Sequence, residues 1–248
     1  MIILKSKSEI EKMAIACRIV AEVLHELVQA VRPGIATLEL DALAERNIRA
    51  RGGVPAFKGY RGFPNTLCVS INEQVVHGIP SRRRLRAGDI VGLDLGAKWE
   101  GYYGDAAVTI PVGQIPAETE CLVATAREAL SIGIKEVGPG KHLSDISHAI
   151  QRFTEARGYN VVRAFVGHGI GTALHEEPQV PNFGPPGRGP RLKAGMILAI
   201  EPMVNLGDAD VEILDDGWTV VTADGQLSAH FEHTVAITDE GPHILTAL

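Results

Sequence analysis

The chain has 248 residues, of which 45% are hydrophobic, 22% charged and 5% aromatic. This profile is that of a soluble globular protein with one sizeable core or two packed halves. The net charge of −6 argues against a surface built for DNA or anionic lipid, and no stretch approaches the ~18 to 20 apolar residues of a membrane span.

The first third of the chain has the pattern of two helices. Ser8 with Glu11 predicts a capping box, and apolar residues recur at helical spacing over 10–31 before a Pro-Gly pair ends the run. Thr37 is predicted to cap a second helix that ends at 52–53. The remaining predicted elements are strands at 67–71, 90–95 and 102–112, helices at 117–137 and 144–157, and strands at 161–166, 196–201, 218–222 and 231–238.

Short sequence matches recur at a nearly constant offset. Residues 31–34 match 137–140 and residues 50–52 match 156–158 at an offset of 106, and residues 85–88 match 192–195 at 107. These matches predict one duplicated α/β unit, approximately 8–112 and 117–240, whose halves face each other about a pseudo-twofold axis within a single catalytic domain, 1–248. Chance similarity of common Pro-Gly and Ala-Gly turns is the alternative.

Three carboxylates lie in predicted strands that are otherwise largely apolar: Asp94 in 90–96, Glu201 in 196–203 and Glu232 in 231–237. A carboxylate on such a strand is tolerated only when it is paired, protonated or bound to metal. For any one of these carboxylates taken alone, the favoured interpretation is an acid on an edge strand whose side chain reaches solvent. Three of them, two related by the offset, favour a shared metal site.

Asp94 and Asp105 flank a predicted hairpin turn around 98–101. A two-residue turn at 99–100 would pair them directly, and a turn one residue later would place them diagonally. In either register both carboxylates share one face of the hairpin, within reach of one ion.

His168 lies in a glycine-rich segment, 167–171 (GHGIG), with a second histidine, His175, seven residues later. The flanking glycines allow close backbone approach and expose the imidazole. One histidine with four carboxylates suits a dinuclear site for Mn, Fe, Co or Zn and argues against a closed thiolate zinc site. Two such ions can activate a water near neutral pH.

The remaining compositional features bear on location. Three widely spaced cysteines without a C-x-x-C motif, and an N-terminus too short for a signal-peptide core, predict a cytoplasmic protein. The basic cluster at 82–86 is interpreted as a solvated loop; the alternative is a docking patch for an acidic partner such as ribosomal RNA.

In these residues and the segments around them, the chain resembles the type I, bacterial-like methionine aminopeptidases of the pita-bread metallohydrolase fold. The resemblance covers nearly the whole length. It rests on the ordered segments 3–6 (ILKS), 72–80 (NEQVVHGIP), 167–171 (GHGIG), 175–180 (HEEPQV), 200–204 (IEPMV) and 232–234 (EHT).

The resemblance implies an α+β fold, with antiparallel sheets forming the active site and helices on the outer face. It implies removal of the initiator methionine from nascent proteins and peptides that have a small second residue, by a monomer that uses two divalent ions (Co, Mn, Fe, Zn or Ni). Asp94 would then chelate one ion, Asp105 and Glu232 would bridge both, and His168 and Glu201 would complete the shell of the other.

The resemblance also implies catalytic and substrate-binding roles. Glu201 would accept the proton of the attacking water, His175 would hydrogen-bond the scissile carbonyl, and His77 would contact the substrate near the scissile amide. Packing of His77 against the site is its structural alternative. The methionine pocket would be lined by Tyr60, Phe63, Cys68 and Trp218, with Phe57 where many relatives carry cysteine and Leu174 where many carry phenylalanine.

Two further positions follow from the resemblance. Asn72 and Ser228 match residues that bind a monovalent cation in some relatives. A thiol-nucleophile role for Cys68 is disfavoured, because no base is placed for it.

Three other assignments fit parts of this sequence. A peptidase of the same fold that cleaves before proline would share the five ligands, but it usually has an additional N-terminal domain and an arginine shortly before the last ligand glutamate, where this chain reads Ala-His-Phe-Glu at 229–232. A non-catalytic binding protein of this fold typically loses ligands. A purely structural α/β protein leaves the acids on apolar strands unexplained.

Overall fold

A computed structural model describes residues 1–247. Within them the chain is α+β, as predicted, with four α-helices, one 3-10 turn at Tyr60–Gly62 and fifteen strands. The helices are α1 (Lys7–Ala30), α2 (Thr37–Ala50), α3 (Ala117–Lys135) and α4 (Leu143–Glu155).

Nine strands form one antiparallel sheet with the order β1-β4-β5-β14-β9-β7-β8, in which β2 also pairs with β4 and β15 with β14. Their bounds are β1 (Val54–Pro55), β2 (Leu67–Ile71), β4 (Ile90–Trp99), β5 (Tyr102–Pro111), β7 (Gly167–Gly169), β8 (Glu176–Val180), β9 (Ile197–Ile200), β14 (Glu232–Thr238) and β15 (Gly241–Ile244). Two three-stranded sheets complete the fold. They are β13 (Ser228–His230), β10 (Met203–Asn205) and β6 (Asn160–Val161), and β11 (Val211–Ile213), β12 (Val220–Thr222) and β3 (Gln74–Val76).

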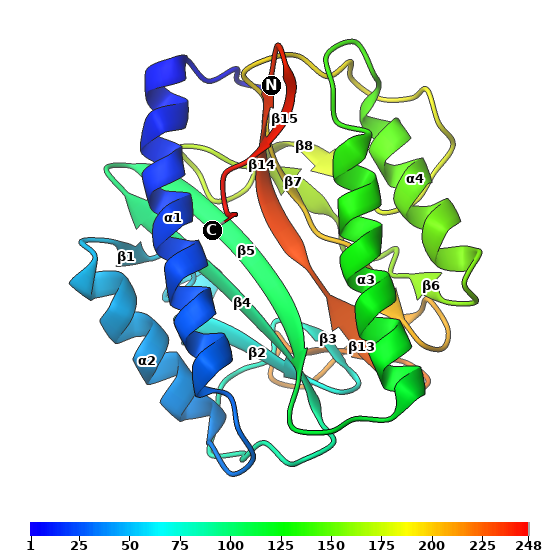
Figure 1. The fold of residues 1–248 in the computed structure, drawn as a ribbon. Helices are drawn as coiled ribbons and strands as arrows, with labels where there is room; N and C mark the ends of the chain where they lie inside the picture. Colours follow the sequence, from blue (N-terminus) through cyan, green and yellow to red (C-terminus); the bar gives the residue numbers. More distant parts are fainter. Residues whose placement is uncertain (248) are drawn as a thin grey trace.

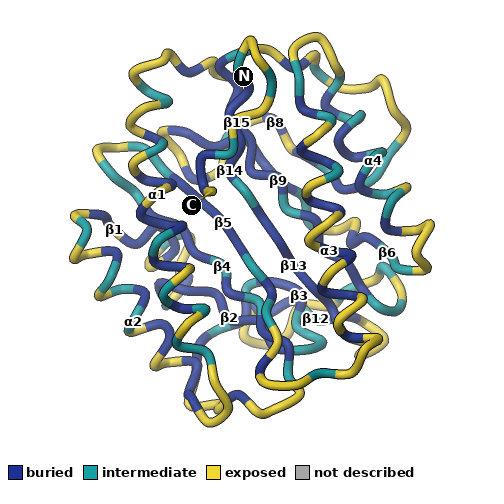
Figure 2. The backbone as a smooth tube through the Cα atoms, in the orientation of Figure 1, coloured by how far each residue is buried: buried dark blue, intermediate teal, exposed yellow. Residues whose placement is uncertain are grey.

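The helices cover one face of the large sheet. Figure 1 shows α1 and α2 over the half built from β2, β4 and β5, and α3 and α4 over the half that contains β14. β5 and β14 meet at the centre. Figure 2 shows that these central strands are buried, whereas the outer surfaces of the helices are exposed. The opposite face of the sheet is therefore free to carry a site.

The capping box of α1 uses Ser6 and Glu9 rather than the predicted Ser8 and Glu11. Both pairs fit the Ser-x-x-Glu pattern, and the earlier pair forms the bonds: the Ser6 amide donates to Glu9 Oε2 at 2.8 Å, and the Glu9 amide donates to Ser6 Oγ at 3.4 Å. Ser8 already lies inside the helix, because the first Ser-x-x-Glu pair starts it two residues earlier.

Thr37 does not cap α2 as predicted. It is the first helical residue, and the preceding Ala36 donates its amide to Glu39 Oε2 at 2.8 Å. The Thr37 hydroxyl instead donates to the carbonyl of Ser81 at 3.0 Å. The hydroxyl of Thr37 is therefore bonded to a distant carbonyl and does not cap the helix.

The predicted strands at 67–71, 90–95 and 102–112 match β2, β4 and β5 to within four residues. The strand predicted at 161–166 is wrong beyond Val161, because β6 ends there. The strand predicted at 218–222 begins only at Val220, because Trp218 and Thr219 donate their amides to Asp216 Oδ1 in a turn.

Equivalent hydrogen bonds recur in the two halves at the offset found in the sequence. The Gly34 amide donates to Leu85 O at 2.7 Å, and the Gly140 amide donates to Leu192 O at 3.0 Å. In the same turns, Arg84 Nη1 donates to Gly34 O at 2.6 Å and Arg191 Nη1 donates to Gly140 O at 2.7 Å. Because these hydrogen bonds match, we propose that the two halves derive from one duplicated unit.

Among residues 1–247, no helix has both the length and the apolar character needed to cross a membrane.

Candidate active site

The β4–β5 hairpin places two of the predicted acids. Its two-residue turn is Glu100 and Gly101, both with positive φ (43° and 90°), which is the backbone of the tight turns that match strand twist. The turn lies one residue later than direct pairing of the acids requires. Asp94 consequently pairs with Ala107, two residues beyond Asp105, and the acids are diagonal neighbours on one face.

The start of β14 adds a third acid to this face. Glu232 pairs with Ala107 from the side opposite Asp94, so the two acids lie in one row across three strands. Thr234 fixes the neighbouring backbone, because its hydroxyl donates to Asp105 O at 2.7 Å and accepts from the Asp105 amide at 3.2 Å. The register of β14 on β5 therefore brings Glu232 to the hairpin acids.

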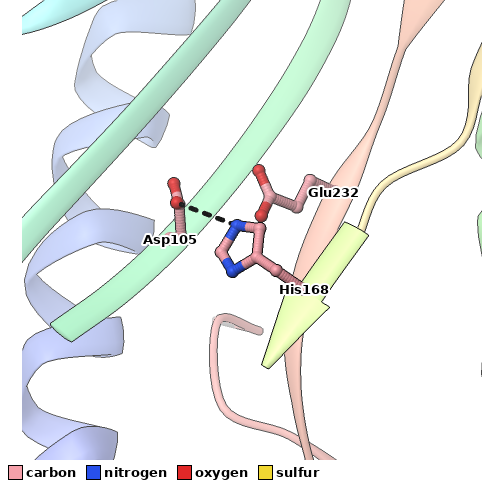
Figure 3. A group of neighbouring side chains, drawn as sticks. All are labelled: Asp105, His168 and Glu232. Carbon is pink, nitrogen blue, oxygen red and sulfur yellow. Dashed lines mark ion pairs between the residues drawn. The ribbon is translucent and has the colours of Figure 1, made fainter. Parts of the chain in front are cut away.

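His168 reaches the acids from β7. Its Nδ1 lies 2.9 Å from the carbonyl of Gly169, a bond that requires the proton on Nδ1 and leaves the Nε2 lone pair free. Nε2 faces Asp105 Oδ2 at 4.0 Å. Ligand atoms of Asp105, His168 and Glu232 all lie within 4.8 Å of one another, and Figure 3 shows the three side chains converging from β5, β7 and β14.

The glycines around His168 are required by close backbone contacts. A Cβ on Gly167 would lie 2.4 Å from Ala199 O, and one on Gly169 would lie 2.2 Å from Glu177 O. Real Cβ atoms do not approach so closely, so only glycine lets β7 fit between β8 and β9. The close backbone approach is as predicted, but the His168 imidazole is buried rather than exposed.

Glu201 follows β9 directly, at the break before Pro202, instead of within a strand as predicted. Its Oε1 lies 3.6 Å from His168 Nε2. Its Oε2 lies 3.7 Å from Nε2 of His230, a buried residue that sequence reasoning missed. The available signal was the spacing of His230 and Glu232, since residues two apart along an extended chain share a face.

Burial raises the pKa of all four carboxyl groups. The pKa of Asp94 rises to about 7 through burial. The pKa of Asp105 rises well above its ordinary value, first through burial and then through Glu232 and Asp94. The pKa values of Glu201 and Glu232 rise for the same reasons, burial first and neighbouring acids second. Four acids this close oppose one another's ionisation unless a cation compensates them.

The cluster fits divalent metal ions. Asp94 Oδ1, Asp105 Oδ1 and Glu232 Oε1 are buried without a hydrogen-bond partner among the described residues, an arrangement that is costly for purely structural acids. Burial, and secondly His175, lowers the pKa of His168 to about 3, so the imidazole is neutral and can donate its lone pair. Oxygen-rich ligands with one imidazole suit first-row divalent ions.

The predicted catalytic, divalent-metal and substrate-binding residues all line one cavity of about 140 Å³, which therefore combines the acids with an apolar wall. It is lined by Phe57, Tyr60, Arg61, Phe63, Cys68, His77, Asp94, Asp105, His168, Leu174, His175, Glu201, Trp218 and Glu232. Arg61 is the one lining residue that the sequence analysis did not name.

Two further histidines flank the acids. The Nδ1 of His175 lies 2.9 Å from the Tyr60 hydroxyl, and its ring centre lies 4.2 Å from that of His168. His77 has a positive φ of 60° and packs edge-on against Trp218, with ring centres 6.2 Å apart. Burial, and secondly His175, lowers the pKa of His77 to about 4. Both imidazoles are therefore neutral near pH 7, available as hydrogen-bond donors or acceptors.

Comparison with known proteins agrees with this geometry. Residues 11–239 match the model of metallopeptidase family M24. The chain is 54% identical over 246 residues to methionine aminopeptidase 1 of Bacillus subtilis (strain 168), covering 99% of both chains. The chain belongs to the methionine aminopeptidases of family M24.

Solved structures show how this family shares its fold with other peptidases. Methionine aminopeptidase from Thermotoga maritima superposes with a TM-score of 0.99 at 48% identity, covering all of both chains. Prolidase from Pyrococcus furiosus superposes with a TM-score of 0.82 at 25% identity, and the chain covers 66% of it. The predicted pita-bread fold is confirmed, and the methionine aminopeptidases match more closely than the prolidase. Membership of a metallopeptidase family implies divalent metal binding.

Proposed function

We propose that this chain is a dinuclear metal-dependent methionine aminopeptidase that removes the initiator methionine from nascent proteins and peptides with a small second residue. The observation that carries the proposal is the single cavity in which four acids and His168 adjoin an apolar pocket. Family membership and the 54% identical relative support the activity.

The five ligands divide between two ions in this proposal. Asp94, Asp105 and Glu232 would hold one ion, and Asp105, Glu232, His168 and Glu201 would hold the other. Asp94 and Glu232 lie in one row across three strands with Asp105 diagonal to them, which supports a shared set of ligands. Two divalent ions bound here, among Co, Mn, Fe, Zn or Ni, would supply an activated water near neutral pH and polarise the scissile carbonyl.

The chain's own residues then carry the proton and the developing charge. Glu201 accepts the proton of the attacking water and passes it toward the leaving amine. His175 donates a hydrogen bond to the scissile carbonyl oxygen as negative charge develops on it. His77 contacts the substrate near the scissile amide. The neutral state of both imidazoles supports these roles, because burial is the first cause that lowers each pKa.

The apolar wall of the cavity gives the specificity. Tyr60, Phe63, Cys68 and Trp218 line it, and Phe63 packs edge-on against Trp218 with ring centres 5.1 Å apart. Burial, and then Asp94, raises the pKa of Cys68 well above its ordinary value, so the residue acts as an apolar thiol rather than a nucleophile. A thioether side chain matches this mixture of aromatic and sulfur groups.

The proposal also includes the location and oligomeric state of the protein, which is expected to be a cytoplasmic monomer that acts on nascent N-termini. Cys17, Cys68 and Cys121 are all free, which suits a reducing compartment. The exposed Arg82 and Arg83 support a transient ribosome contact. A monovalent cation at Asn72 and Ser228 is supported by the Ser228 amide, which donates to Asn72 O at 2.9 Å and so brings the two residues together.

The deciding experiment assays the purified protein with Mn or Co on peptides that begin Met-Ala or Met-Gly and on Xaa-Pro peptides. We expect methionine release and no Xaa-Pro cleavage, because the apolar wall fits a methionine side chain. Preferential Xaa-Pro cleavage would transfer the assignment to the prolidase class. His168→Ala should lose most turnover with the fold retained, and an unchanged rate would refute its role as a ligand.

A further inference from the structure

A buried ion pair joins the N-terminal segment to the active-site loop. Lys5 Nζ lies 2.6 Å from Glu176 Oε2, and the two side chains are only 2% and 11% exposed. The residues are 171 positions apart, and the Lys5 amide donates to Gly195 O at 2.7 Å. A buried lysine is tolerated only with such a partner, so the pair is held as a unit.

The second oxygen of Glu176 folds the loop before it. Glu176 Oε1 accepts the amide of Thr172 at 2.7 Å and the amide of Ala173 at 3.1 Å. A Cβ on Gly171 would lie 2.2 Å from Lys5 Cε and 2.7 Å from Glu176 Oε1, so glycine is needed for the pair to fit. The carboxylate therefore connects Lys5 on one side with the backbone of the loop on the other.

This loop ends at His175, the residue immediately before Glu176. Residues 170–175 form no helix or strand, so the bonds to Glu176 supply order that regular secondary structure does not. We propose that Glu176, anchored by Lys5, is a positioning residue that sets His175 over the scissile carbonyl. The inference rests on the proposed function, which assigns the carbonyl contact to His175.

Removing the loop anchor should affect turnover rather than binding. Tyr60, Phe63, Cys68 and Trp218, which line the methionine pocket, come from outside the loop, and only Leu174 of the pocket residues named above lies in it. We therefore expect Glu176→Ala to lower kcat by about 10- to 100-fold, as misplacement of a reacting group by ~1 Å does. KM for a Met-Ala peptide should change much less.

The test is a double-mutant cycle with His175→Ala. If Glu176 acts through His175, adding Glu176→Ala to His175→Ala should cause little further loss of kcat. Losses that multiply would overturn the inference. Wild-type activity in His175→Ala alone would instead refute the role of His175 in the proposed function, so the two failures are distinguishable.

Three further variants separate positioning from general stability. Lys5→Met removes the anchor and should reproduce the kcat loss. Lys12→Met removes an exposed partner of Glu100, 3.4 Å away, and should leave kcat unchanged. Glu176→Gln keeps one acceptor oxygen and should fall between wild type and Glu176→Ala, whereas a loss as large as that of Glu176→Ala would contradict positioning through the loop amides.

A measurement independent of activity uses metal-free protein labelled with 15N-histidine. Glu176→Ala should shift or broaden the ring signals of His175, which depend on its bond to Tyr60. The signals of His148, held by Gly184 O at 3.1 Å, provide the internal control. If the ring signals of His175 are the same in Glu176→Ala as in the wild type, the inference is overturned, even where turnover is too slow to measure.

Discussion

His230 and Glu201 face each other at 3.7 Å, measured between Nε2 of the imidazole and Oε2 of the carboxylate. The His230 Nε2 atom is buried and makes no hydrogen bond among the described residues. Thr109 fixes the backbone of His230, because its hydroxyl accepts the His230 amide at 2.9 Å and donates to the His230 carbonyl at 2.8 Å. The imidazole is thus placed beside Glu201, where it can orient this proposed metal ligand.

We expect His230→Ala to weaken metal affinity by about 10- to 100-fold, the usual effect of losing a group that orients a ligand. Calorimetric titration of Mn into the metal-free protein measures this directly. His243→Ala, at an exposed position on β15, is the matched control. Equal affinities for the wild type and His230→Ala would show that the contact does not orient Glu201.

The buried acids should make the stability of the metal-free protein depend on pH through Asp94. Burial raises its pKa from 3.8 to about 7, so between these values the folded state binds a proton that the unfolded state has released. The free energy of unfolding contributed by Asp94 therefore falls as pH rises through that window. Asp94→Asn removes this contribution, together with a charge that also raises the pKa values of Asp105, Glu201 and Glu232.

Urea unfolding with a chelator present, at pH 4.5 and pH 7.5, measures the effect. The stability of the wild type relative to Asp94→Asn should be lower at pH 7.5 than at pH 4.5. The buried histidines contribute a pH dependence of opposite sign to the free energy of unfolding. Both proteins contain the same histidines, so this contribution cancels when the two are compared. Parallel pH profiles for the two proteins would contradict the prediction.

Added metal should stabilise the folded protein by binding it in preference to the unfolded chain. At a free Mn concentration 100 times Kd, the expected gain is about 2.7 kcal/mol. Thermal melts with and without Mn measure it. Asp105→Asn should lose most of this gain. Without metal it should melt no lower than the wild type, because it removes one of the buried carboxylates that repel each other.

Gly96 and Gly92 offer a test of the methionine pocket within one strand. A Cβ on Gly96 would lie 2.6 Å from the Phe57 ring and 2.9 Å from the Ala56 Cβ, whereas one on Gly92 would meet nothing closer than 3.6 Å. We expect Gly96→Ala to displace Phe57 in the pocket wall, at a cost of about 1–3 kcal/mol in stability. KM for Met-Ala should rise as well, while Gly92→Ala stays near wild type.

Rescue provides the control for the pocket prediction. Phe57→Leu added to Gly96→Ala should recover part of the lost affinity, because the smaller side chain relieves the contact with the ring while the contact with the Ala56 Cβ remains. Failure of that rescue, with both proteins folded by circular dichroism, would place the defect in β4 itself rather than in the pocket.

The limits of sequence reasoning are clear at the start of α1. Two Ser-x-x-Glu pairs compete there, and the pattern alone does not choose between Ser6 and Ser8. Thr37 has a good capping side chain, yet its hydroxyl bonds the distant Ser81 carbonyl. Local patterns predicted both helices. The start of α1 is satisfied by the neighbouring Ser6 and Glu9, whereas at α2 the distant Ser81 accepts the hydroxyl of Thr37.

The sequence by itself determined the residue types and the short-range geometry: which acids lie on apolar strands, which glycines surround His168, and that Asp94 and Asp105 share a face of one hairpin. Turn chemistry and the two-residue strand period act over a few residues, so they can be read along the chain. Only the tertiary structure decided the pairing of β14 with β5, the approach of His168 and Glu201 to the acids, and the contacts His230–Glu201 and Lys5–Glu176. These depend on how distant strands close against one another and on which groups that closure removes from water.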